Sequence, residues 1–247
     1  MREGWDSEAG NWTRFARTPG HDNTHQDINL PALIDLLPRP GNRTLDLGCG
    51  EGRLGRFLRS EGHRVAGIDS SPAMVRFAAS HAASHEASHE ASPPAMVADA
   101  AALPFRDEAF DLVVAYMCLH DMDQMPRAVA EVGRVLTRGG RLCAAIPHPV
   151  NSAGSFQARE GNAPFVIEGS YLDPGPADSV VERGGIQLTF HSEHRPIEAY
   201  SRALEAVGLL IEAIREPRAP DRLVASDPSK RRWQRIPLSL HIRALKP

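Results

Sequence analysis

The chain has 247 residues, of which 42% are hydrophobic and 24% are charged. This length and apolar content predict one α/β domain rather than two small ones. The formal net charge is −3 and no long basic run is present, so nucleic acid is not an expected partner. The short basic sequence at 230–232 is expected to be a solvated turn.

Cysteine usage and hydropathy predict a cytoplasmic protein. The three cysteines, Cys49, Cys118 and Cys143, are odd in number and show no CxxC spacing, which is typical of a reducing compartment. No apolar run approaches the roughly 18 to 20 residues that span a bilayer, and the first residues lack the apolar stretch of a signal peptide. We therefore expect no membrane association.

Residues 1–40 are expected to form two helices before the first strand. In the first helix, apolar residues recur every three or four positions, at Trp5, Ala9, Trp12, Phe15 and Ala16, which marks one helix face. A second helix is expected over 27–37, with Leu30, Leu33, Ile34 and Leu37 on its buried face. An aromatic face of this kind either packs on the body of the domain or closes over a ligand as a lid.

The segment 44–58, TLDLGCGEGRLGRFL, predicts a strand, a glycine-rich turn and a helix. The glycines allow a tight reversal and let a ligand approach bare backbone. The following helix offers free N–H groups at its N-terminus. The rest of the chain is interpreted around this turn.

Further strands are predicted over 65–68, 96–98, 110–116 and 141–146, with helices at 72–80 and 124–136 between them. The RGG sequence at 138–140 is expected to end the second of these helices. Alternating strands and helices predict a parallel sheet that binds its ligand beyond the carboxyl ends of the strands. The residues at those ends are Asp46, Asp69, Asp99, Tyr116 and His148.

A low-complexity A-S-H-E repeat occupies 82–92. His81, His85 and His89 would share one face if the preceding helix continued, and histidines at that spacing can bind a metal. Because no apolar face accompanies them, a solvated helix extension or a disordered loop is the preferred interpretation. We therefore predict no metal site.

The last hundred residues differ from the alternating core. Residues 150–195 are rich in Gly, Pro and Ser, carry strand-like runs at 165–167 and 186–191, and are interpreted as an inserted cap. A helix over 197–207 follows. Strands over 209–214 and 236–245 are expected to close one sheet edge as an antiparallel pair, with loops between them.

Two kinds of ligand suit the glycine turn. GEGRLG at 50–55 matches GxGxxG, and Asp69 is well placed for a ribose hydroxyl, so a dinucleotide is one candidate. However, Asp46 lies two residues before the first glycine, where a carboxylate would repel a pyrophosphate. This acid favours a ligand with a positive charge, such as an ammonium or sulfonium group.

LDLGCGEGRLG closely resembles motif I of the class I S-adenosylmethionine-dependent methyltransferases. The resemblance continues in order through GIDSSPAM, ADAAALPF, FDLVVAYMCLHDM, LTRGGRLCAAIPHP and the closing segment HRPIEAYSRALEAVGLLIEAIREP. It implies the small-molecule branch of the family and a Rossmann-like, seven-stranded, mostly parallel sheet with helices on both faces and an antiparallel last strand. One domain over 1–247 is then expected, with a lid at 1–40, a cofactor-binding core at 41–149, a cap at 150–195 and a closing part at 196–247.

The resemblance also implies roles for single residues around S-adenosylmethionine. Gly48 and Gly50 would contact its methionine part and ribose, Asp46 would support its ammonium side, and Asp69 would accept from both ribose hydroxyls. The remaining contacts would come from Ser70 and Met74 beside the adenine, Asp99 and the Ala100 N–H at its edge, and the carbonyl groups near Tyr116 and Met117.

Methyl transfer requires alignment of the reacting atoms, exclusion of water and, for a hydroxyl or acidic carbon, a base. His148 and His120 are the leading candidate bases. Phe156, Tyr171, His191 and His194 are predicted to line the substrate pocket, and the two histidines are further candidate bases. The family's NPPY-like tetrad is absent, which favours a small, partly apolar acceptor methylated on O, N or C. An NAD-dependent oxidoreductase and a catalytically silent binding module are the alternatives.

Overall fold

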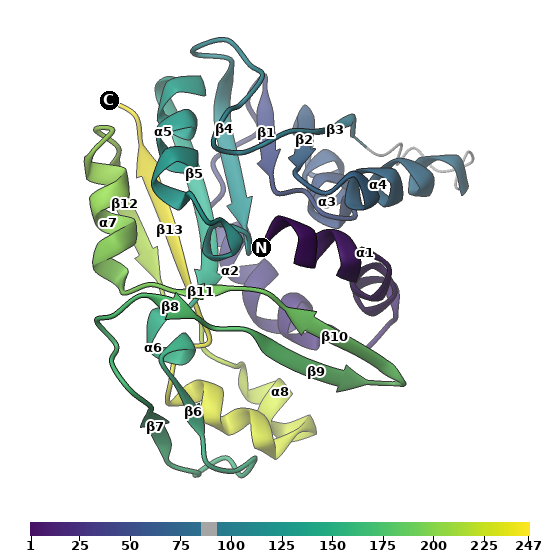
Figure 1. Ribbon diagram of the computed structural model, residues 1–247, viewed down its shortest axis with the longest axis vertical. Coiled ribbons are helices and arrows are strands. Elements are labelled where there is room, and N and C mark those ends of the chain that lie inside the picture. The colour runs from purple at the N-terminus through teal and green to yellow at the C-terminus, as the bar shows by residue number, and fades with distance from the viewer. Residues whose placement is uncertain (85–92) are drawn as a thin grey trace.

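The computed structural model describes residues 1–84 and 93–247, the side chains of 81–84 excepted. Seven strands form one sheet in the order β12-β13-β5-β4-β1-β2-β3 (Figure 1). Strands β1 to β5 run parallel, and β13 lies antiparallel between β5 and β12. The strands are β1 (Thr44–Leu47), β2 (Val65–Asp69), β3 (Ala95–Val97), β4 (Phe110–Tyr116), β5 (Leu136–Pro147), β12 (Leu210–Arg215) and β13 (Ser239–Leu245).

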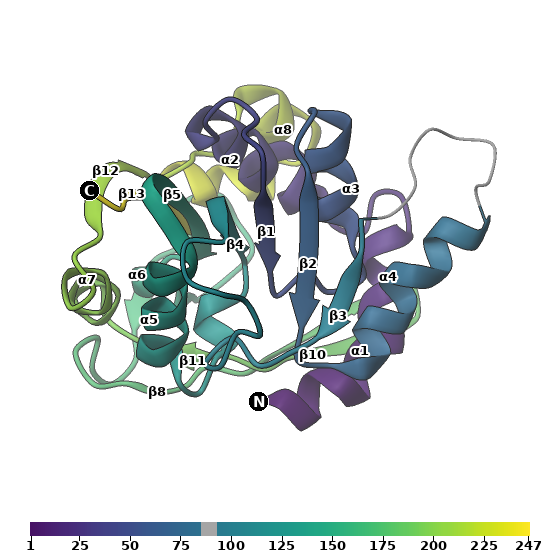
Figure 2. The ribbon, with the colours of Figure 1, turned by 90° about the horizontal axis from the view of Figure 1, so that it is seen from above.

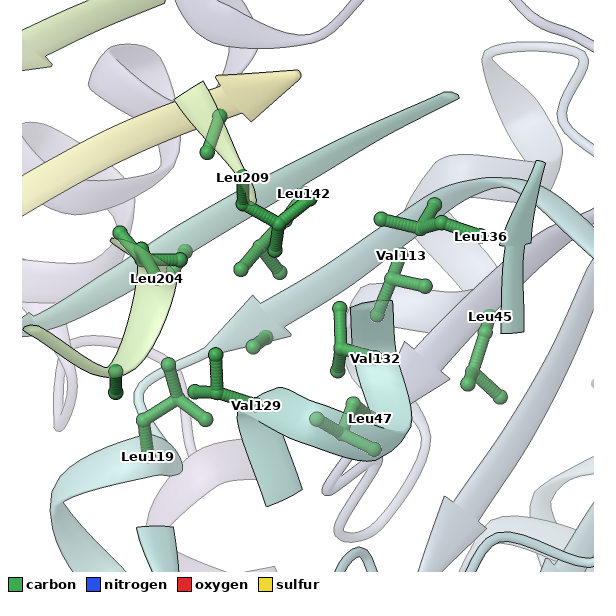
Figure 3. Close-up of a cluster of buried hydrophobic side chains, with 14 of the residues drawn as sticks. Leu45, Leu47, Val113, Leu119, Val129, Val132, Leu136, Leu142, Leu204 and Leu209 are labelled. Carbon is green, nitrogen blue, oxygen red and sulfur yellow. The ribbon is translucent and has the colours of Figure 1, made fainter. Parts of the chain in front are cut away.

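The central strands are buried on both faces, because alternate side chains enter different cores. Val113 of β4 packs on one face with Val129 and Val132 of α5 (Met125–Val135), beside α7 (Ile197–Glu205), as Figure 3 shows. On the other face, Leu112 and Val114 pack with α2 (Leu30–Leu36) and α3 (Arg53–Ser60). Because β1 to β5 run parallel, their carboxyl ends lie together at one edge of this covered sheet.

The N-terminal helix α1 (Arg2–Arg17) lies between α4 (Pro72–Ser84) and the hairpin of β9 (Ser179–Arg183) and β10 (Ile186–Phe190), as Figures 1 and 2 show together. Phe15 packs with Ile186 and Leu188 in a small separate core. The aromatic face predicted for this helix is therefore a packing face against the cap.

The cap consists of short elements beside the sheet. They are α6 (Pro149–Ser152), β6 (Gly154–Phe156), β7 (Phe165–Ile167), β8 (Gly175–Pro176), β9, β10 and β11 (Glu193–His194). Three antiparallel pairs connect these strands: β6 with β7, β8 with β11, and β9 with β10. The strand-like runs predicted at 165–167 and 186–191 are confirmed.

The antiparallel closing strands and the order of the core elements are also confirmed, but three local predictions are wrong. The RGG sequence lies inside β5, where Gly139 has φ +76° and the β4–β5 register shifts. The segment expected as loop forms α8 (Asp221–Ser226) and η3 (Pro228–Gln234). Ile34, expected inside, is 46% exposed. The second predicted helix begins as a π-helix, η1 (His25–Asn29), and continues as α2.

His81, His85 and His89 lie outside the residues whose side chains are described. Among the described helices, none combines the length and apolar content needed to cross a bilayer. The three cysteines are free and buried.

Candidate functional site

A cavity of about 1190 Å³ lies at the carboxyl ends of the parallel strands. Its walls come from the glycine turn, from α1 and η1, and from the cap and η3. The volume exceeds the roughly 300 to 1,000 Å³ of a typical single-ligand pocket. It is lined by most of the residues predicted for the site: Asp46, Gly48, Gly50, Asp69, Ser70, Met74, Asp99, Ala100, Tyr116, Met117 and His120.

The glycine turn approaches its neighbours too closely for a side chain at one position. Gly48 has φ +70°, and a Cβ atom there would lie 2.7 Å from Cβ of Cys118. Both the left-handed backbone and the contact therefore require glycine. The bare backbone of the turn forms part of the cavity wall.

Asp69 connects this turn to the start of α4. Its Oδ2 accepts from the Gly50 N–H at 2.9 Å, and its Oδ1 accepts from the Ser71 N–H at 2.9 Å. Burial raises its pKa, and these two hydrogen bonds oppose the rise. Each carboxylate oxygen has a second lone pair, so the group can still accept from ligand hydroxyls.

Asp46 is a buried carboxylate whose hydrogen bonding is incomplete. It is 1% exposed, and among the described residues its Oδ2 has no hydrogen-bond partner, although the Gly55 N–H donates to the carboxylate. Burial, followed by the negative charge of Asp69, raises its pKa to about 7. A nearby cation would stabilise the ionised form. This orphaned oxygen beside the bare glycine turn fits a cofactor that carries positive charge.

The third predicted acid lies at the rim of the cavity. Oδ1 of Asp99 accepts from the Ala101 N–H at 2.8 Å, and the side chain is largely exposed. Met74, which is 3% exposed, and Ala100 provide apolar surface in the same wall. Carboxylate and apolar surface together suit a planar heterocycle with an exocyclic amine.

Further residues of this wall were missed in the sequence analysis. Nδ1 of His25 and the hydroxyl of Tyr116 share a hydrogen bond of 2.7 Å. Arg53 donates to Asp22 at 2.7 Å, and its guanidinium lies 5.2 Å from the ring centre of Trp12. Burial, with the charge of Arg53, lowers the pKa of His25 to about 4. The only sequence signals were that Asp22 and His25 lie within the predicted lid and that Arg53 follows the glycine turn.

His120 lines the cavity beside Asp121 in η2 (Leu119–Asp121). Its Nε2 lies 3.0 Å from Oδ1 of Asp121, but within the described part of the chain neither that oxygen nor Nδ1 of His120 forms a hydrogen bond with good geometry. Burial, with the charge of Arg195, lowers the pKa of His120 to about 3, and burial raises the pKa of Asp121. This pair favours its neutral forms.

His148 does not line the cavity, contrary to the role predicted for it. Its Nδ1 accepts from the Val150 N–H at 3.1 Å at the start of α6, and its Nε2 lies 2.9 Å from Oε1 of Glu216. Both ring nitrogens are thus engaged, Nδ1 at the start of α6 and Nε2 with the segment that follows β12.

The four residues predicted for the substrate pocket also lie outside the cavity lining. Phe156 packs edge-on against Trp233. Tyr171 accepts the Ile197 N–H and, through its carbonyl group, contacts His194, while His191 faces Asp178. These side chains connect the cap elements to one another and to η3 and α7.

Lys230 and Arg232 line the cavity from η3 together with Trp233, whereas Arg231 between them is exposed and outside the lining. The prediction of a solvated turn is therefore wrong for two of the three basic residues. The place of Lys230 and Arg232 in the cavity wall could not be predicted from sequence spacing, because it depends on the tertiary structure. Arg159 and Arg183, from the distant cap, line the same cavity.

Comparison with known proteins identifies methyltransferases among the proteins that this chain resembles. Residues 45–144 match a family model described as a methyltransferase domain. The chain is 35% identical over 126 residues to a demethylmenaquinone methyltransferase of Thermus thermophilus, covering 50% of this chain and 55% of that protein. It is 33% identical over 134 residues to the 27-O-demethylrifamycin SV methyltransferase of Amycolatopsis mediterranei, covering 54% and 48%. The chain spans about half the length of the curated relatives it matches.

A solved S-adenosylmethionine-dependent methyltransferase from Mesorhizobium loti superposes with a TM-score of 0.70 at 25% identity, covering 87% of this chain and 96% of that one. Fold, glycine turn and strand-end acids define a domain for an S-adenosyl cofactor. Residues 45–144 thus form a methyltransferase domain, and the chain has the fold of the S-adenosylmethionine-dependent methyltransferases.

Proposed function

We propose that the chain transfers a methyl group from S-adenosylmethionine to a small-molecule acceptor. The observation that carries this proposal is the unpartnered carboxylate oxygen of Asp46, buried beside the glycine turn in the cavity wall. When bound, the cofactor supplies a methyl group on a sulfonium, which is already activated for displacement. The chain binds the cofactor and the acceptor, aligns their reacting atoms and excludes water from them.

The cofactor-binding roles follow from the acids at the strand ends. Asp69 would accept from the ribose hydroxyls through its remaining lone pairs, while Asp99 and the Ala100 N–H would contact the adenine edge. Asp46 would stabilise the ammonium side, and Gly48 and Gly50 would let the ligand approach the backbone. Ser70, Met74 and the carbonyl groups near Tyr116 and Met117 would complete the contacts.

Helix α1 is proposed to act as a lid in addition to packing on the cap. Trp5 and Trp12 line the cavity and meet Phe190 of β10 at ring-centre distances of 6.1 and 5.9 Å. On the opposite side, Asp6 accepts from the hydroxyl of Ser71 and, at 3.2 Å, from the Ala73 N–H. A helix held at both walls of the cavity excludes water from the reacting atoms.

Alignment, and not strong base catalysis, is proposed as the main source of rate. Three histidines of the described chain line the cavity: His21, His25 and His120. The lowered pKa values of His120 and His25, about 3 and 4, keep both rings neutral at pH 7 and make each a weak base. Nδ1 of His120 can accept a hydrogen bond from an acceptor hydroxyl.

The names of two relatives support a small-molecule acceptor, because they give demethylmenaquinone and 27-O-demethylrifamycin SV as substrates. The NAD-dependent alternative has no support among the family matches. A catalytically silent binding module remains the second candidate, since the histidines in the cavity are weak bases.

Calorimetry and an acceptor panel test the proposal. S-adenosylmethionine and S-adenosylhomocysteine are expected to bind and NAD is not; binding of NAD alone would refute the proposed cofactor. Mass spectrometry of a small-molecule panel incubated with S-adenosylmethionine should then show products heavier by one methyl group. Tight cofactor binding without any methylated product would favour the silent module.

A further inference from the structure

Four cations from three separate segments line the cap side of the cavity. Arg159 lies between β6 and β7, Arg183 ends β9, and Lys230 and Arg232 lie in η3. We call these four residues the basic cluster. Their convergence is a tertiary feature, because up to 73 residues of sequence separate its members.

Only one member of the basic cluster has a carboxylate partner among the described residues. Nζ of Lys230 lies 3.8 Å from Oδ2 of Asp227, at the limit of an ion pair. Arg183 donates to the carbonyl group of His21. In the described part of the chain, neither Arg183 nor Arg159 forms a salt bridge.

Arg232 is held over aromatic rings and not beside an acid. Its guanidinium lies 5.6 Å from the ring centre of Phe156 and 5.3 Å from that of Trp233. Its Nε is buried and has no hydrogen-bond partner in the described structure. A buried donor without a partner is costly, so this N–H is suited to a ligand acceptor.

Three acids from the cap and η3 line the cavity, and two of them accept backbone hydrogen bonds. Asp227 accepts from the Ser229 N–H at 3.1 Å at the start of η3, and Asp178 accepts from the Ser192 N–H at 3.0 Å. Glu182 is the third and is exposed. The four cations of the cluster therefore outnumber these three carboxylates.

The cluster also repels itself. Burial lowers the pKa of Lys230, and although Asp227 opposes this, the positive charges of Arg183, Arg232 and Arg159 each lower it further. An anion between these groups would remove the repulsion and satisfy the free N–H donors.

We propose that the methyl acceptor is a small molecule carrying a carboxylate or phosphate group, which binds at the basic cluster. Three of its four members are arginines, whose planar forks bind either oxyanion with two parallel hydrogen bonds. Trp233 offers an apolar wall beside the cluster for the rest of the molecule. That this ligand is the acceptor depends on the proposed function; that the cluster binds an oxyanion does not.

Ligand-observed NMR titrations of the full chain test this inference, with and without saturating S-adenosylhomocysteine. The probes are phenylacetate, phenyl phosphate and the neutral, nearly isosteric phenylacetamide. At least one anion is expected to bind at least tenfold more tightly than the amide, and the stronger of the two identifies carboxylate or phosphate as the preferred group. The double variant K230Q/R232Q should weaken that anion at least tenfold, since two charged donors are lost.

Arg231→Gln is the matched control, because Arg231 is exposed and outside the lining; it should leave anion affinity within about twofold. Unchanged S-adenosylhomocysteine affinity verifies that each variant is folded. Equal binding of amide and anions, no binding of either anion, or equal losses in the control and the double variant would each overturn the inference. Selective anion binding by a chain that binds no S-adenosylhomocysteine would uphold the oxyanion site while refuting the proposed methyl transfer.

Discussion

The two sides of the cavity have opposite polarity. Asp46, Asp69 and Asp99 approach it from the ends of the parallel strands, whereas arginines and a lysine approach it from the cap and η3. The acids sit on a rigid sheet in consecutive motifs, and the cations come together from distant loops. One cavity can in this way hold a cationic cofactor beside an anionic acceptor, because each wall neutralises a different ligand. The predictions below test this division in order of decreasing effect.

Asp46→Asn is expected to show the largest effect: it should raise the free energy of unfolding and weaken cofactor binding. The carboxyl pKa of about 7 in the native state lies above the unfolded value of about 3.9. Its stabilising contribution is thus fully present below pH 4 and is lost as pH rises through 7. At pH 8 the neutral variant should be more stable by on the order of 2–4 kcal/mol but bind S-adenosylmethionine more weakly.

Urea unfolding of both proteins at pH 5 and pH 8 measures this difference. The stability gained by Asp46→Asn should shrink at the lower pH, where the wild-type carboxyl is protonated in the native state. A gain that is the same at both pH values would contradict the raised pKa.

Asp69→Ala tests the ribose contact on the acidic side. Loss of a charged hydrogen bond should cost about 1.5–3 kcal/mol, or roughly ten- to hundredfold in the Kd of S-adenosylhomocysteine measured by calorimetry. Asp173→Ala, at an exposed acid outside the cavity, is the control. A change below about threefold for Asp69→Ala would show that the ribose assignment is wrong.

Trp12→Ala tests whether α1 acts as a lid over the acidic and basic sides of the cavity. The ring stacks on Phe15, meets Trp5 and Phe190 edge-on, and lies against Arg53. With each aromatic pair worth about 0.5–1.5 kcal/mol, amide hydrogen exchange in α1 should accelerate and the Kd of S-adenosylhomocysteine should rise severalfold. Arg14→Ala, at an exposed position of the same helix, should do neither.

His148→Ala should have the smallest effect on the site. The variant loses the cap of α6 and the contact with Glu216, which should lower the free energy of unfolding by about 0.5–2 kcal/mol. Calorimetry should find cofactor affinity unchanged. A methylation rate that fell by orders of magnitude, with a shifted pH profile, would restore His148 as a catalytic residue.

The sheet and its acidic side were predictable because their determinants are local. A short apolar run ending in an acid, followed by glycines, specifies a strand end and a turn whatever lies elsewhere in the chain. Asp46, Asp69 and Asp99 could therefore be placed on one edge from sequence periodicity and strand order alone.

The cap side was not predictable because its determinants are distant. In the sequence, residues 230–232 are typical of a solvated turn. Only the tertiary structure places Arg159 and Arg183 near them. His148 and the aromatic side chains of the cap were assigned to the site because they follow a strand or lie in a loop, but their contacts connect the cap to neighbouring elements. The RGG sequence misled for a related reason: a left-handed glycine suits a kinked strand as well as a helix end.

The position of α1 has a thermodynamic consequence. Its Asp6 accepts hydrogen bonds from Ser71 and Ala73 at the start of α4, while its tryptophans contact Phe190 of the cap. If one helix must be ordered for either ligand to be enclosed, whichever ligand binds first pays the ordering entropy for both. Cofactor and acceptor are then expected to raise each other's affinity by the same factor, since coupling between two binding sites is reciprocal.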